Sequence, residues 1–149
     1  MSNLVQHHVY VGLGSNLGDR RHSLTEAIRL IGERVGEVVR QSSFIETEPW
    51  GFQSDHAFLN AVVLCLTEKT PREVLQLTQQ IERDLGKTKA HATKREGSPP
   101  ASYHNRPIDI DILLYDDWTV QEPDLQIPHP LMHERDFVMI PLNEITNQY

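Results

Sequence analysis

The chain has 149 residues, a formal net charge of −7 at pH 7 and a single cysteine, Cys65. This length suits one domain, 1–149, whose core needs no disulfide or metal to hold it together. One cysteine excludes an internal disulfide and a zinc cluster of several cysteines, and the acidic balance argues against a surface that coats nucleic acid. No signal peptide and no membrane span is recognisable, so we expect a cytoplasmic monomer with neither nucleic-acid nor membrane partners.

The first half of the chain predicts a strand, a helix and two further strands. Residues 9–13 are apolar and run into a glycine-rich loop, 12–19, whose spacing fits neither a dinucleotide fingerprint nor a P-loop. Strands are also predicted over 38–46 and 58–66. A helix is predicted between the glycine-rich loop and the strand over 38–46, because apolar residues recur with helical spacing at Leu24, Ala27, Ile28, Ile31 and Val35, and Gly36 should end it.

Asn60 is the only polar side chain within the strand predicted over 58–66. A buried amide has to find hydrogen-bond partners. It either satisfies neighbouring backbone groups or reads a polar ligand, and the strand alone does not decide between these two interpretations.

A second helix begins at Thr70-Pro71-Arg72-Glu73, which is a capping box with proline at the first helical position. We expect Gly86 to end it. The segment 87–106 has no period and reads as a loop, of the length often found in lids and binding loops. Five positively charged residues cluster in this segment: Lys87, Lys89, Lys94, Arg95 and Arg106. They either bind phosphate or form a solvated run of charge.

The stretch 105–115 contains two acidic residues in a strand-like pattern. Asp109 and Asp111 alternate with apolar residues, which places both carboxylates on one face. Their Cα atoms would be ~7 Å apart, and at an effective dielectric constant of ~20 they would repel by on the order of 2 kcal/mol. Either Mg²⁺ lies between them, with Arg106 binding a phosphate, or the strand face is simply solvated.

The remaining segment predicts a turn at Asp116-Asp117, after which 118–120 would pair back as a hairpin. His129 and His133 stand four residues apart, but flanking prolines and the lack of a third ligand argue against zinc. The order of elements is that of an α+β protein with a ferredoxin-like βαββαβ sandwich and an extra C-terminal hairpin and short helix. Its helices would cover one face of the sheet and leave the other free for a site.

Three separated segments together resemble the 6-hydroxymethyl-7,8-dihydropterin pyrophosphokinases of folate biosynthesis. They are Gly12 to Gly18, Glu46 to Gly51 with Phe58 to Ala61, and Arg106 to Leu113 followed by Ile127 to Phe137. The resemblance spans nearly the whole chain and implies a ferredoxin-like fold. It also implies a Mg²⁺-dependent transfer of pyrophosphate from ATP to the pterin hydroxymethyl oxygen, with release of AMP.

The resemblance also implies roles for individual residues. Asp109 and Asp111 would bind two Mg²⁺ ions that bridge the triphosphate, and with Arg106 they would form the catalytic group. Phe58 and Phe137 would sandwich the pterin ring. The residues implied for ATP are Gln79, Glu82, Lys87, Lys89, Arg106, His129 and Arg135, and those implied for the pterin are Thr47, Glu48, Trp50, Phe58, Asn60, Tyr103 and Phe137.

Two other classes of function stay open on the residues alone. A noncatalytic ferredoxin-like binding module would have no need to pair Asp109 with Asp111 beside a cationic segment. An ordinary kinase would use the same metals and differ only in the phosphorus that is attacked, a distinction that only the resemblance makes. The chain departs from the family pattern at Lys87-Thr88-Lys89, where Arg-x-Arg is common and lysine cannot provide the same bidentate fork.

Overall fold

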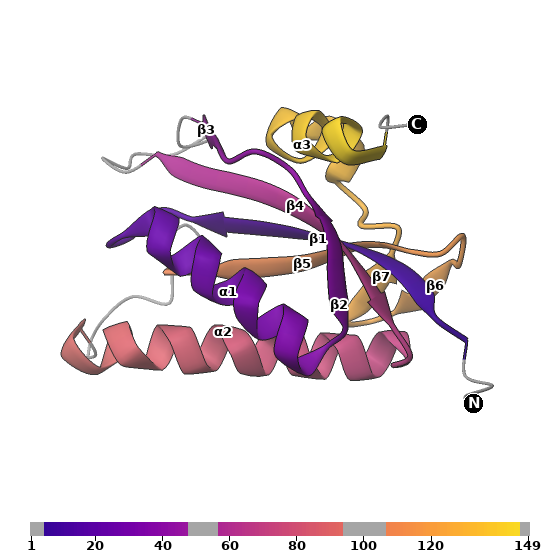
Figure 1. The fold of residues 1–149 in the computed structure, drawn as a ribbon, viewed down its shortest axis with the longest axis horizontal. Helices are drawn as coiled ribbons and strands as arrows, with labels where there is room; N and C mark the ends of the chain where they lie inside the picture. The colour runs from indigo at the N-terminus through magenta and orange to yellow at the C-terminus, as the bar shows by residue number, and fades with distance from the viewer. Residues whose placement is uncertain (1–4, 48–56, 94–106, 147–149) are drawn as a thin grey trace.

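The sheet at the centre of the molecule is antiparallel, with the strand order β2-β4-β1-β5 (Figure 1). The computed structural model describes residues 5–47, 57–93 and 107–146, with the backbone alone from 87 to 93. The strands are β1 (His7–Ser15), β2 (Glu37–Gln41), β3 (Ile45–Thr47), which also pairs with β4, β4 (Phe58–Thr67) and β5 (Asp109–Tyr115). This order and the elements between the strands confirm the predicted ferredoxin-like α+β fold.

Two helices cover one face of the sheet: α1 (Arg20–Arg34) and α2 (Pro71–Thr93) (Figure 1). The predicted capping box starts α2, because Thr70 and Glu73 each accept a hydrogen bond from the other's backbone nitrogen. Alternate residues of β1, β4 and β5, with Ile108 just before β5, form the main core with the helices: Val9, Val11, Leu13, Leu59, Ala61, Val63, Ile108, Ile110 and Ile112. No helix in the described ranges is long and apolar enough to cross a membrane.

The second face of the sheet is partly covered by α3 (Asp136–Thr146), although the sequence analysis expected it to be free. The chain reaches α3 through the hairpin of β6 (Val120–Glu122) and β7 (Leu125–Ile127) and the 3-10 turn η1 (Met132–Glu134). The apolar stripe of α3 has to be buried, and it forms a second cluster with the sheet: Val62, Leu64, Leu113, Met132, Val138, Leu142 and Ile145. Only part of this face is therefore left for a site.

The strand predicted over 38–46 is two strands, β2 and β3, separated around Ser42. The Ser42 hydroxyl accepts a hydrogen bond of 2.9 Å from the backbone nitrogen of Val62, where a strand would offer its carbonyl. Glu144 of α3 then accepts hydrogen bonds from the backbone nitrogen and hydroxyl of Ser43, at 3.1 and 2.8 Å. Serine side chains that compete with the backbone for hydrogen bonds interrupt the ladder here.

The two predicted helix ends have different outcomes. Gly36 follows α1 as predicted, and a Cβ there would collide with the backbone carbonyl of Leu66, so glycine is required by the close approach of β4. Gly86 does not end α2, which continues to Thr93. A glycine inside a helix costs only ~1 kcal/mol, and the lysines and alanines that follow favour the helix. The start of the predicted loop is therefore helical.

The hairpin predicted for 118–120 was expected to pair with the strand before the turn, but the segment that contains Val120 pairs with β7. The turn at Asp116 is present, with φ of 50°, and the backbone nitrogen of Trp118 donates to the carbonyl of Tyr115 at 3.0 Å. The Trp118 ring then packs against the rings of His7 and Tyr115, with centroid distances of 5.3 and 4.8 Å. The segment after the turn thus packs through Trp118 against the end of β5, and the hairpin forms later, between β6 and β7.

Candidate functional site

The candidate site residues meet on the second face of the sheet because of the strand register. Gly14 of β1 pairs with Asn60 of β4 on one side and with Asp109 of β5 on the other. Two residues along β1, Gly12 pairs with Val62 of β4 on one side and with Asp111 of β5 on the other. Neighbouring strands lie ~4.8 Å apart, so Asn60 and Asp109 are separated by ~10 Å across a strand that carries no side chain at this position.

Asp109 and Asp111 point to the same face, as predicted, because they alternate with the buried isoleucines of β5 on the helix side. Both aspartates are half-buried. The next residue on their face, Leu113, is 1% exposed and belongs to the cluster under α3. The two carboxylates therefore lie at the edge of an apolar surface, where charges are screened less than in open water.

Glu82 of α2 holds the backbone between these two aspartates. β5 is the edge strand, so alternate backbone nitrogens point away from β1 and need another acceptor. The Glu82 carboxylate accepts a hydrogen bond of 2.7 Å from the nitrogen of Ile110. This contact gives Glu82 a role in positioning β5, and the role beside the nucleotide that the resemblance implies for Glu82 stays a prediction. Gln79, assigned to the same side, is exposed on α2.

His129 and Arg135 approach the same end of the site from the segment after β7. The Ile127-Pro128 peptide bond is cis, and the backbone nitrogen of His129 donates to the carbonyl of Leu113 at 3.0 Å. Burial and then the charge of Arg135 lower the pKa of His129, while the charge of Asp109 opposes them. Arg135 and Asp109 are thus both close enough to His129 to influence its charge.

Asn60 and Thr47 form the other wall of the site. The amide nitrogen of Asn60 donates a hydrogen bond of 2.9 Å to the Thr47 hydroxyl, and Asn60 is only 4% exposed. Thr47 on β3 pairs in turn with Phe58 on β4. The partner of the Asn60 amide is therefore the side chain of another predicted pterin residue, where one of the two interpretations expected a backbone group.

Phe58 and Phe137 both lie on the second face. Phe58 is two residues before Asn60 on β4, so both side chains point to the same face. Phe137 packs against the cluster under α3. The Arg135 guanidinium lies 5.6 Å from the centre of the Phe137 ring, which is the distance of a cation–π contact. An aromatic residue implied for the pterin and an arginine implied for ATP are thus in contact.

Several predicted site residues lie outside the described part of the chain. These are Glu48, Trp50, Tyr103 and Arg106. Lys87 and Lys89 belong to the last turns of α2, where only the backbone is described. The roles implied for these six residues stay predictions.

The aspartate pair suits Mg²⁺ in its chemistry. Magnesium prefers oxygen ligands and is commonly held by one or two carboxylates, with water and substrate phosphate oxygens completing its shell. Within the described residues, no group of three or more histidine, cysteine, aspartate and glutamate side chains is arranged to hold a metal. The carboxylate oxygens of Asp109 and Asp111 are donors of the kind that such an ion takes.

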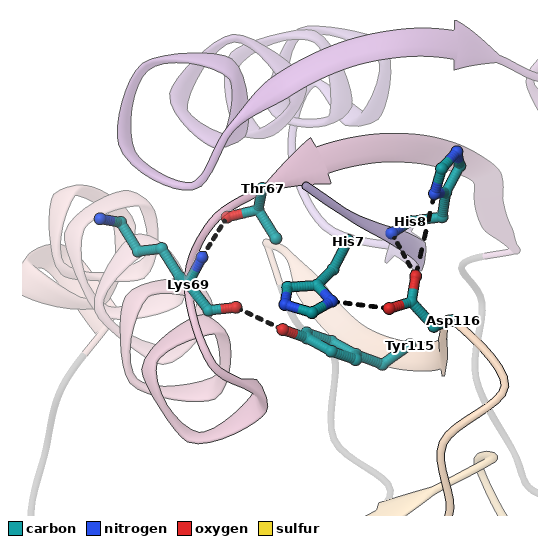
Figure 2. Close-up of polar contacts among 6 residues, drawn as sticks. All are labelled: His7, His8, Thr67, Lys69, Tyr115 and Asp116. Carbon is teal, nitrogen blue, oxygen red and sulfur yellow. Dashed lines mark hydrogen bonds and ion pairs between the residues drawn. The ribbon is translucent and has the colours of Figure 1, made fainter. Parts of the chain in front are cut away.

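The opposite end of β1 and β5 carries a polar cluster that the sequence analysis did not identify (Figure 2). The carboxylate of Asp116 accepts hydrogen bonds from the ring of His7 at 2.6 Å and from the backbone nitrogen of His8 at 2.7 Å. The Tyr115 hydroxyl donates to the carbonyl of Lys69 at 2.6 Å. These contacts join β1, β5 and the start of α2 at the far end of the strands from Gly14, so they hold the fold together outside the site.

Gly12 and Gly14 were assigned to a glycine-rich loop, whereas both lie in β1, and Gly14 borders Asn60 and Phe58. Their alternation with Val11 and Leu13, both buried in the main core, was the signal that could have placed them in a strand with a bare second face.

Comparison with known proteins supports the resemblance seen in the residues. The sequence model of the 7,8-dihydro-6-hydroxymethylpterin-pyrophosphokinase family matches residues 10–147. The chain is 51% identical over 138 residues to the 2-amino-4-hydroxy-6-hydroxymethyldihydropteridine pyrophosphokinase of Porphyromonas gingivalis, covering 92% of this chain and 89% of that protein. It is 39% identical over 140 residues to the Bacillus subtilis enzyme of the same name, covering 93% and 78%.

Solved structures agree on the fold. The wild-type HPPK-DHPS of Plasmodium falciparum with pterin and p-hydroxybenzoate superposes with a TM-score of 0.72 at 16% identity. That match covers 100% of this chain and 41% of the solved one, so the chain spans about two-fifths of that protein. Together with the sequence matches, the fold and the arrangement of residues place this chain in the 7,8-dihydro-6-hydroxymethylpterin-pyrophosphokinase family.

Proposed function

We propose that the protein transfers pyrophosphate from ATP to the hydroxymethyl oxygen of 6-hydroxymethyl-7,8-dihydropterin and releases AMP, a step of folate biosynthesis. The observation that carries this proposal is the row formed by Asn60, Gly14 and Asp109. It sets a polar amide and a carboxylate ~10 Å apart across a bare strand. A flat heterocycle can lie in that space with its substituent directed toward the carboxylates.

In the proposed reaction, the hydroxymethyl oxygen attacks the β-phosphorus of ATP. A bond forms between that oxygen and the β-phosphorus, and the bond from the β-phosphorus to the oxygen that bridges to the α-phosphorus breaks. The electron pair of the broken bond leaves with AMP, and the hydroxyl proton is released. Such transfers depend mainly on positioning and on stabilising charge, so this proposal assigns no side chain as general base.

The proposed metal ligands are Asp109 and Asp111, which would hold two Mg²⁺ ions. When bound, the ions would offset the negative charge of the triphosphate. The half-buried position of the two carboxylates supports this assignment, because their mutual repulsion is relieved by a cation. Glu82, through its hydrogen bond to the nitrogen of Ile110, would keep both carboxylates on one face at a constant spacing.

His129 and Arg135 are proposed to bind phosphate oxygens of ATP. Both carry nitrogen donors, and the electrostatic influence of Arg135 and Asp109 on His129 supports a location beside the metal ligands. Thr47, Asn60 and the aromatic pair Phe58 and Phe137 would bind the pterin. We further propose that the chain acts as a single domain, as its length suggests, and as a monomer in the cytoplasm, a reducing compartment that suits its single cysteine.

The nucleotide product tests this proposal. The protein is incubated with ATP, Mg²⁺ and 6-hydroxymethyl-7,8-dihydropterin, and nucleotides are separated by chromatography, with a control lacking the pterin. AMP that forms only with the pterin is the expected result. ADP would mean transfer of a single phosphoryl group. A folded chain that forms no product would indicate a noncatalytic binding module.

A further inference from the structure

Gly14 has no conformational reason to be glycine. Within the described part of the chain, Gly18 is the glycine with a positive φ, at 70°, so the backbone at Gly14 is one that other residues adopt. Gly14 lies in the central strand β1, where glycine is unfavourable because it loses much freedom and packs nothing. Its presence there calls for a reason of space.

The space above Gly14 is bounded by two predicted pterin residues. A Cβ placed on Gly14 would lie 3.0 Å from the amide oxygen of Asn60 and 3.4 Å from Cδ1 of the Phe58 ring. The first distance is shorter than nearly all contacts that real Cβ atoms make, so the amide would have to move by a few tenths of an ångström. The side chains of Asn60 and Phe58 therefore rest against the bare backbone of Gly14.

Asn60 has little freedom to give way. Its amide nitrogen is bound to the Thr47 hydroxyl at 2.9 Å, and its side chain is buried on a strand that pairs on both sides. A methyl group at position 14 would thus either break the Asn60–Thr47 hydrogen bond or turn the amide out of its present plane. Each outcome changes the direction in which the amide presents its donor and acceptor.

We propose that Gly14 is a specificity-determining residue for the pterin. Because Gly14 has no side chain, the amide of Asn60 and the ring of Phe58 can keep their present positions. The bare backbone also leaves room for a flat heterocycle to cross β1 toward Asp109. This inference rests on the proposed function, because it names the part of the backbone over which the substrate of that reaction lies. Gly14 acts on the substrate partly through Asn60, which makes the coupling between these two residues measurable.

Gly12 provides a matched control on the same strand and the same face. The three heavy atoms nearest to a Cβ at Gly12 would all belong to the Leu113 side chain, at 3.4 to 3.6 Å, which is ordinary van der Waals contact. A methyl group there touches an apolar side chain of the cluster under α3 and leaves Asn60 untouched.

The test measures pterin binding for wild type, Gly14→Ala, Gly12→Ala, Asn60→Ala and the double variant Gly14→Ala/Asn60→Ala. Binding of 6-hydroxymethylpterin is followed by calorimetry with a nonhydrolysable ATP analogue and Mg²⁺ present, and ATP-analogue binding is measured separately. We expect the Kd for the pterin to rise about tenfold in Gly14→Ala, the loss of about one hydrogen bond. Gly12→Ala should stay within about twofold of wild type, and the affinity for the ATP analogue should be unchanged in Gly14→Ala.

Coupling separates a positioning role from a general loss of packing. If Gly14 acts through Asn60, adding Gly14→Ala to the Asn60→Ala variant should weaken pterin binding by less than about twofold. Fully additive losses, or a Gly14→Ala variant that binds pterin like wild type, would overturn the inference. Should the single variant not fold, recovery of folding in the double variant supports it and failure of both counts against it. A wild-type protein that binds no pterin would instead refute the proposed function.

Discussion

The carboxylate of Glu82 on α2 accepts a hydrogen bond of 2.7 Å from the backbone nitrogen of Ile110, the residue between Asp109 and Asp111. This contact ties a helix of the first face to the edge strand that carries the proposed metal ligands on the second face. Since the bonded nitrogen and the two carboxylates belong to consecutive residues, any displacement of the strand at this point moves both aspartates.

We therefore expect Glu82→Ala to lower both the stability and the turnover of the protein. A buried backbone nitrogen that loses its acceptor costs about 1–3 kcal/mol of unfolding free energy. Glu82→Gln keeps an acceptor oxygen and should recover most of this stability. Denaturant unfolding and kcat for AMP formation measure the two effects. A Glu82→Ala variant with unchanged stability would show that the hydrogen bond does not hold β5.

Asp109→Asn and Asp111→Asn should each abolish turnover while the fold remains intact. Each change removes a negative charge from the proposed Mg²⁺ ligands but keeps the shape of a half-buried side chain. AMP formation at saturating ATP and Mg²⁺ is the measurement, with thermal unfolding to check the fold. Asp117→Asn, at an exposed turn position, is the control and should behave like wild type. Near-normal turnover in either site variant would contradict the metal assignment.

Local patterns in the sequence were sufficient for the strand predicted over 58–66 and for the common face of Asp109 and Asp111, because alternation along a strand follows from its geometry alone. They failed where tertiary contacts decide. Ser42 interrupts a strand by bonding to Val62, and α2 runs past Gly86 because the residues beyond it favour a helix. The contact of Glu82 with Ile110 joins segments 28 residues apart. Local periodicity contains no information on such a pair.

The pKa of His129 is lowered from its usual value of about 6.5, first by burial and then by Arg135. The free protein therefore holds His129 neutral at neutral pH. Since the unfolded chain takes up a proton below about pH 6.5 and the folded chain does so only at lower pH, this residue makes stability fall as the pH drops through that window. A triphosphate next to the ring would favour the protonated form instead.

We accordingly expect ATP binding to be accompanied by proton uptake and to strengthen as the pH falls from about 8 to about 6. Calorimetry of ATP binding in buffers with different ionisation enthalpies measures the proton uptake. His129→Gln should remove it, whereas His133→Gln, on the exposed 3-10 turn, should keep it. Proton uptake that persists in His129→Gln would mean that another group titrates.

Asp116 gives a prediction about stability that is separate from the site. Burial of its carboxyl acts to raise the pKa, but hydrogen bonds from the backbone nitrogen of His8 and from the ring of His7 prevail and lower it (Figure 2). A lowered carboxyl pKa adds stability above the unfolded value of about 3.9, and this stability is lost as the pH falls through the folded pKa.

Asp116→Asn should therefore lower the unfolding free energy at neutral pH and flatten its decline between about pH 5 and about pH 2.5. Asparagine tolerates the positive φ of 50° at this position, so the loss reports the carboxylate and not the turn. Because Asp116 lies at the far end of β5 from Asp109, kcat should be unchanged at temperatures where the variant is folded. Denaturant unfolding across this pH range provides the measurement. If the unfolding free energy of the variant declined with falling pH as steeply as that of wild type, other carboxylates would dominate the decline.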